Sequence, residues 1–380
     1  MLIILWDEKK IVEKILRYTS LAKKGKSQHY FITGKKGIGK TSLATYVQQL
    51  MKDDMVGVYI SNKNNNSLET LTTNIIEKIL NKLPKSVVKD KLKSIVGLID
   101  GVEFKSTKIN FNPKPEITKD LVNHFEDYLN KICKNIPENK GILLIIDDIN
   151  GLSDSKDFVN WYKRLVDTIT VDVDYNIPIY FLLDGYPEKF NNLVNYDESF
   201  SRIFHHDEIE LLKDQEVQNF FIDTFKEVNM GCDSQALDLM VTYSSGLPLM
   251  MQEIGEAVFW ETDTKKVSGI DANMGIIEAG KLIGKRQIKP VMDKSIRSEN
   301  YENIFLKLGK FNIDYFKKNE FEKKLTSVEK RAFPKFLKRA TDLNILESIG
   351  KDKSGEYKFS NRLYLVYFRI LNLEKNNILS

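Results

Sequence analysis

A glycine-rich run connects an apolar segment to a helical segment near the start of this chain of 380 residues. The apolar run HYFIT (29–33) predicts a buried strand, and TSLATYVQQLM (41–51) has the spacing of a helix. Between them, residues 34–41 read Gly-Lys-Lys-Gly-Ile-Gly-Lys-Thr, which matches the pattern GxxxxGK[ST]. This order restricts the local fold to a strand–loop–helix unit whose backbone amides converge at a helix N-terminus.

Such a loop has the chemistry of a phosphate-binding site. Its backbone N–H groups would contact the phosphates, Lys40 would reach the β- and γ-phosphates, and the Thr41 hydroxyl would bind Mg²⁺. The residues expected to contact the nucleotide are Gly34, Lys35, Lys36, Gly37, Ile38, Gly39, Lys40, Thr41 and Ser42. We predict ATP as the ligand, with GTP as the alternative nucleotide. A glycine-rich turn that binds no nucleotide is the simpler interpretation.

A second motif, GILLIIDD (141–148), is an unbroken apolar run that ends in two carboxylates. This pattern is typical of a strand buried on both faces. Asp147, at the end of the strand, would hold Mg²⁺, and Asp148 would polarise the attacking water. The alternative is a pair of solvated acids at a strand end. A strand and helices separate the two motifs, an order that resembles the additional-strand class of P-loop ATPases rather than kinases or GTPases.

Apolar strands alternate with helical segments through the first half of the chain, which predicts a parallel α/β sheet. Further strands are expected at 56–60, 177–184 and 206–211, and residues 84–118 read as an insertion with a β-hairpin at 102–111. One helix is expected at 118–135 and another at 156–170. We predict an ATPase core at 1–212, a helical domain at 213–283 and a third domain at 284–380. In the last domain, helices near 301–309, 318–325 and 328–345 precede a hairpin at 346–360.

Composition and charge exclude several classes of protein. No apolar run reaches the roughly 18 residues of a membrane span, and the apolar N-terminal stretch is too short for a signal peptide. Cys133 and Cys232 match no disulfide framework or zinc spacing, so we expect a cytoplasmic protein.

The charge is unevenly distributed along the chain. Residues 284–380 contain 22 Lys/Arg and 12 Asp/Glu, a net charge of +10, whereas residues 1–283 have a net charge of −6. This indicates an anionic partner or, equally, the solvated surface of a lysine-rich protein.

Three further segments, with the two motifs, carry a resemblance to a known family. LLDGYPE (182–188), SFSRIF (199–204) and SSGLPLMMQEIG (244–255) follow in the order found in AAA+/STAND ATPases. The sequence resembles the archaeal-type, origin-recognition-complex-like group over residues 27–283, and more weakly over 284–380. The resemblance implies a core, a small helical lid and a C-terminal winged helix.

The resemblance also implies site residues. Asp184 takes the first sensor position, and Arg202 takes the place of an arginine that completes a nucleotide site, often that of a neighbouring subunit. Pro248, in Gly246-Leu247-Pro248, would pack near the adenine from the lid. With Lys40 and Asp148, Asp184 and Arg202 form the expected catalytic set. The simpler interpretations are a helix-cap or turn acid for Asp184 and a surface salt-bridge arginine for Arg202.

Two departures from the family pattern favour a slow switch over a motor. Asp148 stands where rapid hydrolysers have the longer Glu. No arginine follows Pro248 as a second sensor, and Gln252 is the nearest polar residue.

The last domain presents cations on a helix that could enter a DNA groove. They are Lys330, Arg331, Lys335, Lys338 and Arg339, with Lys351 and Lys353 at the tip of the hairpin. Pro334 within this helix indicates a kink or a first-turn proline. Packing on the ATPase core or holding a partner protein is the alternative role. A lysine-rich stretch in the insertion reads as a solvated hairpin, and His205 and His206 read as edge histidines rather than metal ligands.

Two functions follow from these features. The first is an ATP- and Mg²⁺-dependent switch that controls homo-oligomer formation and association with double-stranded DNA, with sites shared through Arg202. The second is a STAND-like signalling or defence ATPase that recruits a separate effector protein without binding DNA. Neither requires a membrane.

Overall fold

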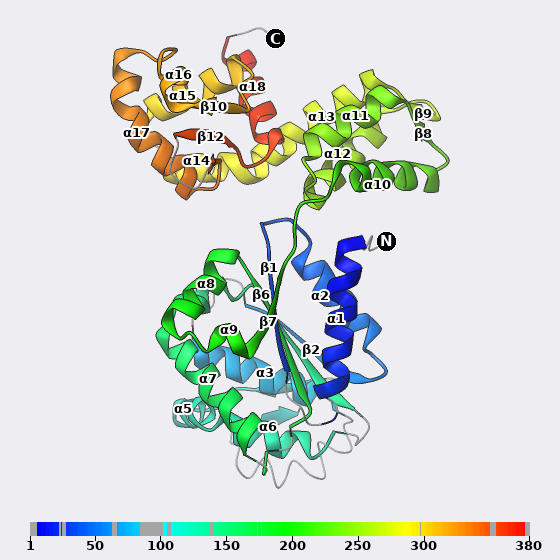
Figure 1. The fold of residues 1–380 in the computed structure, drawn as a ribbon, viewed down its shortest axis with the longest axis vertical. Coiled ribbons are helices and arrows are strands. Elements are labelled where there is room, and N and C mark those ends of the chain that lie inside the picture. Colours follow the sequence, from blue (N-terminus) through cyan, green and yellow to red (C-terminus); the bar gives the residue numbers. More distant parts are fainter. Residues whose placement is uncertain are drawn as a thin grey trace. The chain divides into compact units, whose positions relative to one another are not determined.

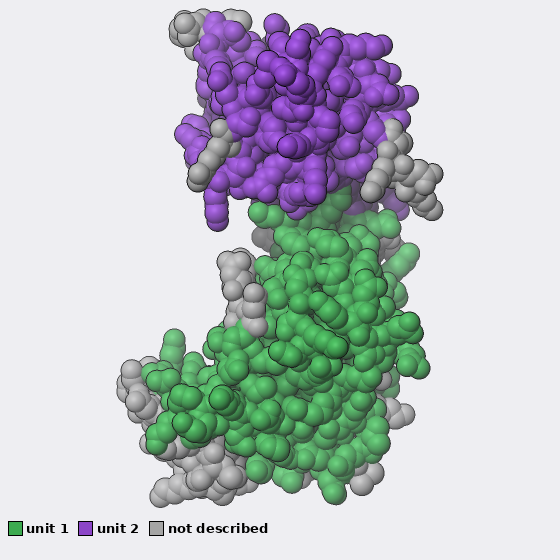
Figure 2. All heavy atoms as spheres, turned by 90° about the vertical axis from the view of Figure 1, so that its left-hand side faces the viewer, with its two compact units in different colours: residues 1–210 green, residues 211–380 purple. Residues whose placement is uncertain are grey.

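The computed structural model divides the chain into two compact units, residues 1–210 and 211–380 (Figures 1 and 2). It describes residues 6–22, 24, 28–62, 67–83, 102–104, 108–136, 140–172, 174–175, 177–296, 298–349 and 355–376. In these ranges no helix is long and apolar enough to cross a membrane.

A five-stranded parallel sheet forms the centre of the first unit, in the order β2-β5-β6-β1-β7 (Figure 1). The strands are β1 (Gln28–Thr33), β2 (Met55–Ser61), β5 (Gly141–Asp147), β6 (Ile179–Gly185) and β7 (Phe204–Glu208). β6 lies between β1, which leads into the glycine-rich loop, and β5, which ends in the paired acids. The predicted additional strand is therefore confirmed.

Helices cover both faces of this sheet, which explains why its central strands are apolar throughout. Every residue of β5 and β6 is buried. Helices α1 (Trp6–Ala22) and α2 (Lys40–Leu50) lie on one side, and α3 (Leu68–Lys82), α7 (Lys156–Val171) and α8 (Pro187–Tyr196) lie on the other (Figure 1). The 3₁₀-helix η1 (Ile149–Asp154) follows β5, and the short helix α9 (Phe200–Ile203) precedes β7.

The insertion contains the predicted hairpin, an antiparallel pair of β3 (Val102–Phe104) and β4 (Ile109–Phe111). Asn81 of α3 holds β4 through its side-chain amide, whose Oδ1 accepts from the Ile109 N–H and whose Nδ2 donates to the Ile109 carbonyl. Most lysines of the predicted basic stretch, those at 85, 89, 91, 93 and 105, lie outside the residues whose side chains are described.

The single helix predicted at 118–135 is wrong. The chain instead forms α5 (Pro115–Asn123) and α6 (Phe125–Cys133), separated by a non-helical His124 with φ −127°. Phe125 and Leu129 of α6 lie in the main core beside α7, as does Leu121 of α5. The fifth strand also begins two residues earlier than predicted, at Phe204.

The second unit begins with four helices between residues 214 and 283. They are α10 (Asp214–Glu227), α11 (Ser234–Ser244), α12 (Pro248–Glu261) and α13 (Gly269–Ile283), with a small parallel pair of β8 (Gly231–Cys232) and β9 (Lys266–Val267). Gly246 precedes α12 with φ +70°, and a Cβ there would lie 2.3 Å from the Leu212 carbonyl oxygen. Only glycine permits this close approach of the two backbones.

The remaining residues form a set of helices with a small antiparallel sheet. In chain order they form α15 (Glu299–Lys310), β10 (Tyr315–Lys317), α16 (Lys318–Glu322), α17 (Ser327–Asp342), β11 (Leu346–Ile349) and β12 (Glu356–Phe359). The three strands make an antiparallel sheet in the order β10-β12-β11. A π-helical turn η2 (Gly284–Ile288) and α14 (Lys289–Ser295) precede this domain, and α18 (Arg362–Lys375) follows it. β10 and α18 were not predicted.

Aromatic packing forms the core of this domain. Phe305 of α15 stacks on Phe368 of α18 with ring centroids 4.4 Å apart, and meets Phe336 of α17 at 4.7 Å. Thr326 and Glu329 form a capping box that fixes the start of α17. Pro334 lies in the interior of α17, so the first-turn alternative is wrong, and its ring removes one helical hydrogen bond.

Candidate nucleotide site

The glycine-rich loop runs from the end of β1 to the first turn of α2. Gly37 and Gly39 have φ values of 82° and 106°, which other residues rarely adopt. These glycines let the loop fold back on itself, and the Ile38 N–H donates to the Lys35 carbonyl at 3.3 Å. The Lys40 ammonium donates to the carbonyls of Gly34 at 2.8 Å and Lys35 at 3.1 Å, across the mouth of the loop.

Thr41 and Asp147, which come from elements far apart in the sequence, are in direct contact. The Thr41 hydroxyl donates to the two carboxylate oxygens of Asp147 at 2.9 and 3.1 Å. The hydroxyl of Tyr59, near the end of β2, also donates to this carboxylate. Asp147 is buried, so these hydroxyls balance a charge that is removed from bulk water.

Asp184 lies at the end of β6, between β1 and β5, and is paired in register with Ile32. Burial and the neighbouring Asp147 charge raise the pKa of Asp184 well above its usual value. Its Oδ1 accepts the Asp148 N–H at 3.2 Å, and its buried Oδ2 has no partner among the described residues. A buried oxygen without a partner marks this position as one prepared for a ligand or water.

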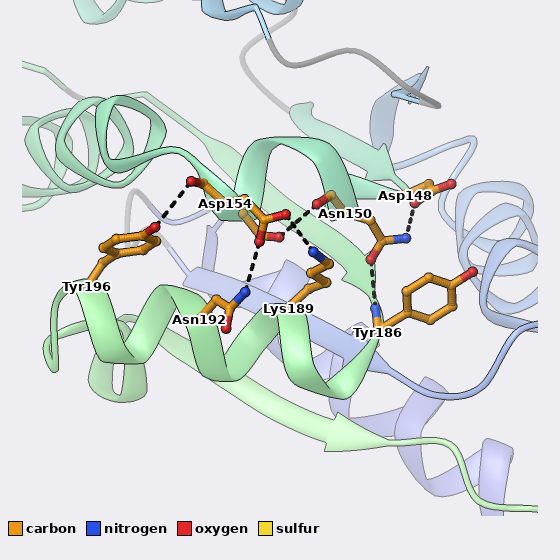
Figure 3. A network of polar contacts seen from close by, with 8 residues as sticks. Asp148, Asn150, Asp154, Tyr186, Lys189, Asn192 and Tyr196 are labelled. Atoms are coloured by element: carbon orange, nitrogen blue, oxygen red, sulfur yellow. Dashed lines mark hydrogen bonds and ion pairs between the residues drawn. The ribbon is translucent and has the colours of Figure 1, made fainter. Parts of the chain in front are cut away.

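Asp148 adopts a left-handed conformation, with φ and ψ both 63°. This conformation is uncommon for a residue other than glycine and is concentrated at functional sites. The Asn150 amide donates to Asp148 Oδ1, and Asn150 Oδ1 accepts the Tyr186 N–H at 3.0 Å (Figure 3). The turn after β5 is thereby joined to the turn after β6.

The electrostatics of Lys40 follow from its position among these acids. Partial burial lowers the pKa of Lys40, while the carboxylates of Asp184, Asp148 and Asp147 act in the opposite direction. Its ammonium also lies 5.1 Å from the centre of the Tyr186 ring, a cation–π arrangement. The Lys40 ammonium can bind a polyanion such as a chain of phosphates. The neighbouring acids would repel such a ligand unless it binds together with a metal cation.

The other residues predicted from the resemblance lie further along the chain. Arg202 is exposed on α9, and its side chain makes no hydrogen bond or ion pair with the described residues. The structure therefore does not bring Arg202 into contact with the loop of its own chain. Pro248 is the first residue of α12, in the second unit, and Ser42 is exposed in the first turn of α2.

The predicted basic helix is α17, and all five of its cations are exposed. None of them forms an ion pair with a described carboxylate. Arg331 and Arg339 each donate only to a backbone carbonyl, that of Ser327 and of Ser295, at 3.4 Å. Lys351 and Lys353, the predicted tip of the hairpin, lie outside the described residues.

The two adjacent histidines pack against aromatic rings, as the simpler interpretation expects. His205 stacks on Tyr18 at 3.9 Å, and His206 stacks on Phe190 at 4.2 Å while bonding Thr33. Within the described residues no group of three or more His, Cys, Asp or Glu could hold a metal ion.

Sequence patterns alone missed Tyr59, Asn150 and Tyr186. Tyr59 reads as an ordinary strand residue, and its contact with Asp147 depends on the pairing of β2 with β5. Asn150 and Tyr186 follow the ends of β5 and β6 by a few residues. Polar and aromatic residues just beyond neighbouring parallel strands were the available signal, because these strand ends meet at one edge of the sheet.

Comparison with solved structures finds the same fold in several ATPases. The ORC2 protein of Aeropyrum pernix, in its ADPNP–ADP complexes, matches with a TM-score of 0.58 and 13% identity, covering 98% of this chain and 94% of that one. The Walker-type ATPase PABY2304 of Pyrococcus abyssi matches with a TM-score of 0.57 and 14% identity, covering 96% and 95%. The Aeropyrum pernix ORC1 protein in complex with DNA matches at 0.51 and 12%, covering 99% and 95%.

At these identities the likeness is one of fold. A search among curated proteins found no match. A family profile described as an ATPase domain predominantly from Archaea matches residues 12–254, which is more than half of the chain. The match includes the glycine-rich loop, the paired acids at the end of β5 and the turn before α12. The chain therefore belongs to this family of predominantly archaeal ATPases.

Proposed function

We propose that this ATPase is a slow switch whose nucleotide state controls self-association and binding to double-stranded DNA. The observation that carries the nucleotide part is the meeting of Thr41, Asp147 and Asp184 beside the Lys40 ammonium. These groups come from three separate elements and supply a cation, a hydroxyl and carboxylates around one loop. Such a set suits a nucleoside triphosphate with a divalent ion.

The residues at this site fit Mg²⁺. Thr41 and Asp147 offer hydroxyl and carboxylate oxygens, the ligand type that Mg²⁺ prefers, and Asp184 adds a buried oxygen without a partner. The small number of protein ligands also fits, because Mg²⁺ usually keeps several waters and binds substrate phosphates as well. When bound, this ion would neutralise negative charge on the β- and γ-phosphates.

Hydrolysis requires a water to attack the γ-phosphorus, forming one P–O bond as the bond to the β–γ bridging oxygen breaks. We assign the orientation of this water, and acceptance of its proton, to the Asp148 carboxylate. Lys40 would leave the Gly34 and Lys35 carbonyls to contact the β- and γ-phosphates. Asp148 is one methylene shorter than the glutamate of rapid hydrolysers, which supports slow turnover.

The exposed cations of α17 support the DNA part of the proposal. They have no carboxylate partners among the described residues, and they lie on the third helix of a winged-helix arrangement. A structural neighbour, the Aeropyrum pernix ORC1 protein, was solved in complex with DNA. We assign α17 to phosphate-directed contact with duplex DNA, and residues 213–283 to a helical lid.

Charge reversal on α17 tests this assignment. We expect Lys335→Glu/Lys338→Glu to weaken duplex DNA binding by roughly 10-fold or more at moderate salt. Each lost phosphate contact reduces the number of counterions that the DNA releases on binding, and this release favours the complex. The slope of log K against log salt should fall by about 2. Fluorescence anisotropy across a salt series measures both quantities. The matched control is Lys265→Glu/Lys266→Glu, an exposed pair in the same unit, and equal losses in both variants would remove α17 from the interface.

Arg202 supports the self-association part, since it is exposed and has no partner within its own chain among the described residues. We expect ATP to increase the mass of the wild-type protein in light scattering. Arg202→Ala should lower ATP turnover by about tenfold or more if this arginine neutralises phosphate charge on a neighbouring subunit. Mixing Arg202→Ala with Asp148→Asn should then restore part of the activity, because one interface in the mixture has both residues. Failure of mixing to restore turnover contradicts a site shared in trans.

An apolar surface on the lid helices favours the second candidate function, recruitment of a separate protein. Trp260 is 75% exposed, Ile270 77% and Met274 51%, on α12 and α13. A contiguous exposed apolar patch is typical of a protein-interaction site. This second function would be supported if the protein binds no duplex DNA at low salt with either ATP or ADP.

A further inference from the structure

Asn150 bonds two functional turns with one side chain. Its Nδ2 donates to the Asp148 carboxylate, and its Oδ1 accepts the Tyr186 N–H at 3.0 Å (Figure 3). The ring of Tyr186 in turn lies near the Lys40 ammonium, at 5.1 Å. One amide group thus connects the acid after β5, the turn after β6 and the cation of the glycine-rich loop.

The segment that carries Asn150 is itself held in place. η1 faces α8 through Asp154, whose carboxylate accepts from Lys189 at 2.6 Å and from Asn192 at 2.8 Å (Figure 3). A Cβ at Gly185 would lie 3.2 Å from Asn150 Oδ1. The absence of a side chain at Gly185 therefore leaves room for the Asn150 amide beside the turn after β6. These contacts leave Asn150 little freedom to rotate away from Asp148.

The contacts of Asp148 differ between its two carboxylate oxygens. Oδ1 accepts from Asn150, while Oδ2 makes no hydrogen bond with the described residues. The backbone is fixed as well, because the Asp148 N–H donates to Asp184 at 3.2 Å. A carboxylate with one oxygen held and the other free resembles the general arrangement of a base oriented by a third group.

We propose that Asn150 is a positioning residue for ATP hydrolysis, which fixes the Asp148 carboxylate so that its free oxygen meets the attacking water. This inference rests on the role proposed for Asp148. Asn150 itself touches neither the loop nor the acid Asp147 through any hydrogen bond that the structure shows, so its effect on turnover passes through Asp148.

Substituting Asn150 by Asp separates the two halves of its amide. An aspartate keeps the oxygen that accepts from Tyr186 but cannot donate to Asp148. We expect kcat to fall by roughly 10- to 100-fold, as for other residues that orient a reacting group. The KM for ATP and the thermal midpoint should stay close to wild type. Asn150→Ala, which adds no charge, should lose a similar share of kcat.

The matched control is Asn130→Asp, the same change in the same unit, at a residue outside this network whose amide donates to the Asp174 carbonyl. It should leave kcat unchanged. In a background of Asp148→Asn, single-turnover hydrolysis should be insensitive to Asn150→Asp, because both changes remove one function. If the two changes multiply, or if Asn150→Asp raises KM without lowering kcat, Asn150 does not position Asp148. If Asp148→Asn alone hydrolyses ATP normally, the proposed role of Asp148 fails, and that outcome is distinct.

Discussion

Lys40→Ala is expected to reduce ATP affinity by roughly 100-fold or more, because two charge-assisted hydrogen bonds to phosphate are worth about 3 kcal/mol together. In the structure this ammonium bridges the Gly34 and Lys35 carbonyls and is surrounded by acids. Without this ammonium, the site would have no lysine to offset the repulsion between the triphosphate and the carboxylates of Asp147, Asp148 and Asp184. Isothermal titration with ATP and Mg²⁺ measures the loss.

Lys52→Ala is the control for Lys40→Ala, since Lys52 is an exposed lysine in the turn after α2. It should bind ATP as the wild type does. Normal ATP binding by Lys40→Ala would remove the glycine-rich loop from the nucleotide site.

Asp148→Asn is expected to lower kcat by about 100-fold or more, within the range attributed to a general base. The substitution keeps the size of the side chain and an oxygen that can accept from Asn150. Because it removes a negative charge near the γ-phosphate, ATP affinity should be equal or higher. Rapid-quench turnover and equilibrium binding, measured on the same preparation, separate the two effects.

Asp167→Asn provides the comparison for this change, because Asp167 is an exposed acid on α7 of the same unit, outside the network of Asn150. It should lose stability at most, with kcat retained. Wild-type turnover by Asp148→Asn would assign water activation to another residue.

The sequence predicted the parts of the site that local pattern determines. The loop at 34–41 needs glycines at fixed spacing, and β5 must be apolar over its whole length because both its faces are covered. Both features are visible without knowledge of neighbours. The additional strand was expected from the resemblance, and the position of β6 between β1 and β5 confirms it.

The missed features depend on contacts between distant segments. Asn150 contacts Tyr186 because β6, which precedes Tyr186, lies beside β5 in the sheet. Tyr59 contacts Asp147 because β2 pairs with β5. The break at His124 has no glycine or proline to announce it. β10 is three residues long and is a strand only through its pairing with β12.

The central claim is that the nucleotide in the loop controls association with DNA, and one comparison tests it most directly. Asp148→Asn, which we expect to hydrolyse ATP at least about 100-fold more slowly than the wild type, can be loaded with ATP, and the same protein can be loaded with ADP. A switch requires that the two states bind the partner with different affinity, since equal affinities shift no equilibrium. We expect the Kd for duplex DNA at one fixed salt concentration to differ by about tenfold or more between the two states. Equal Kd values, or no binding in either state at low salt, would contradict the account.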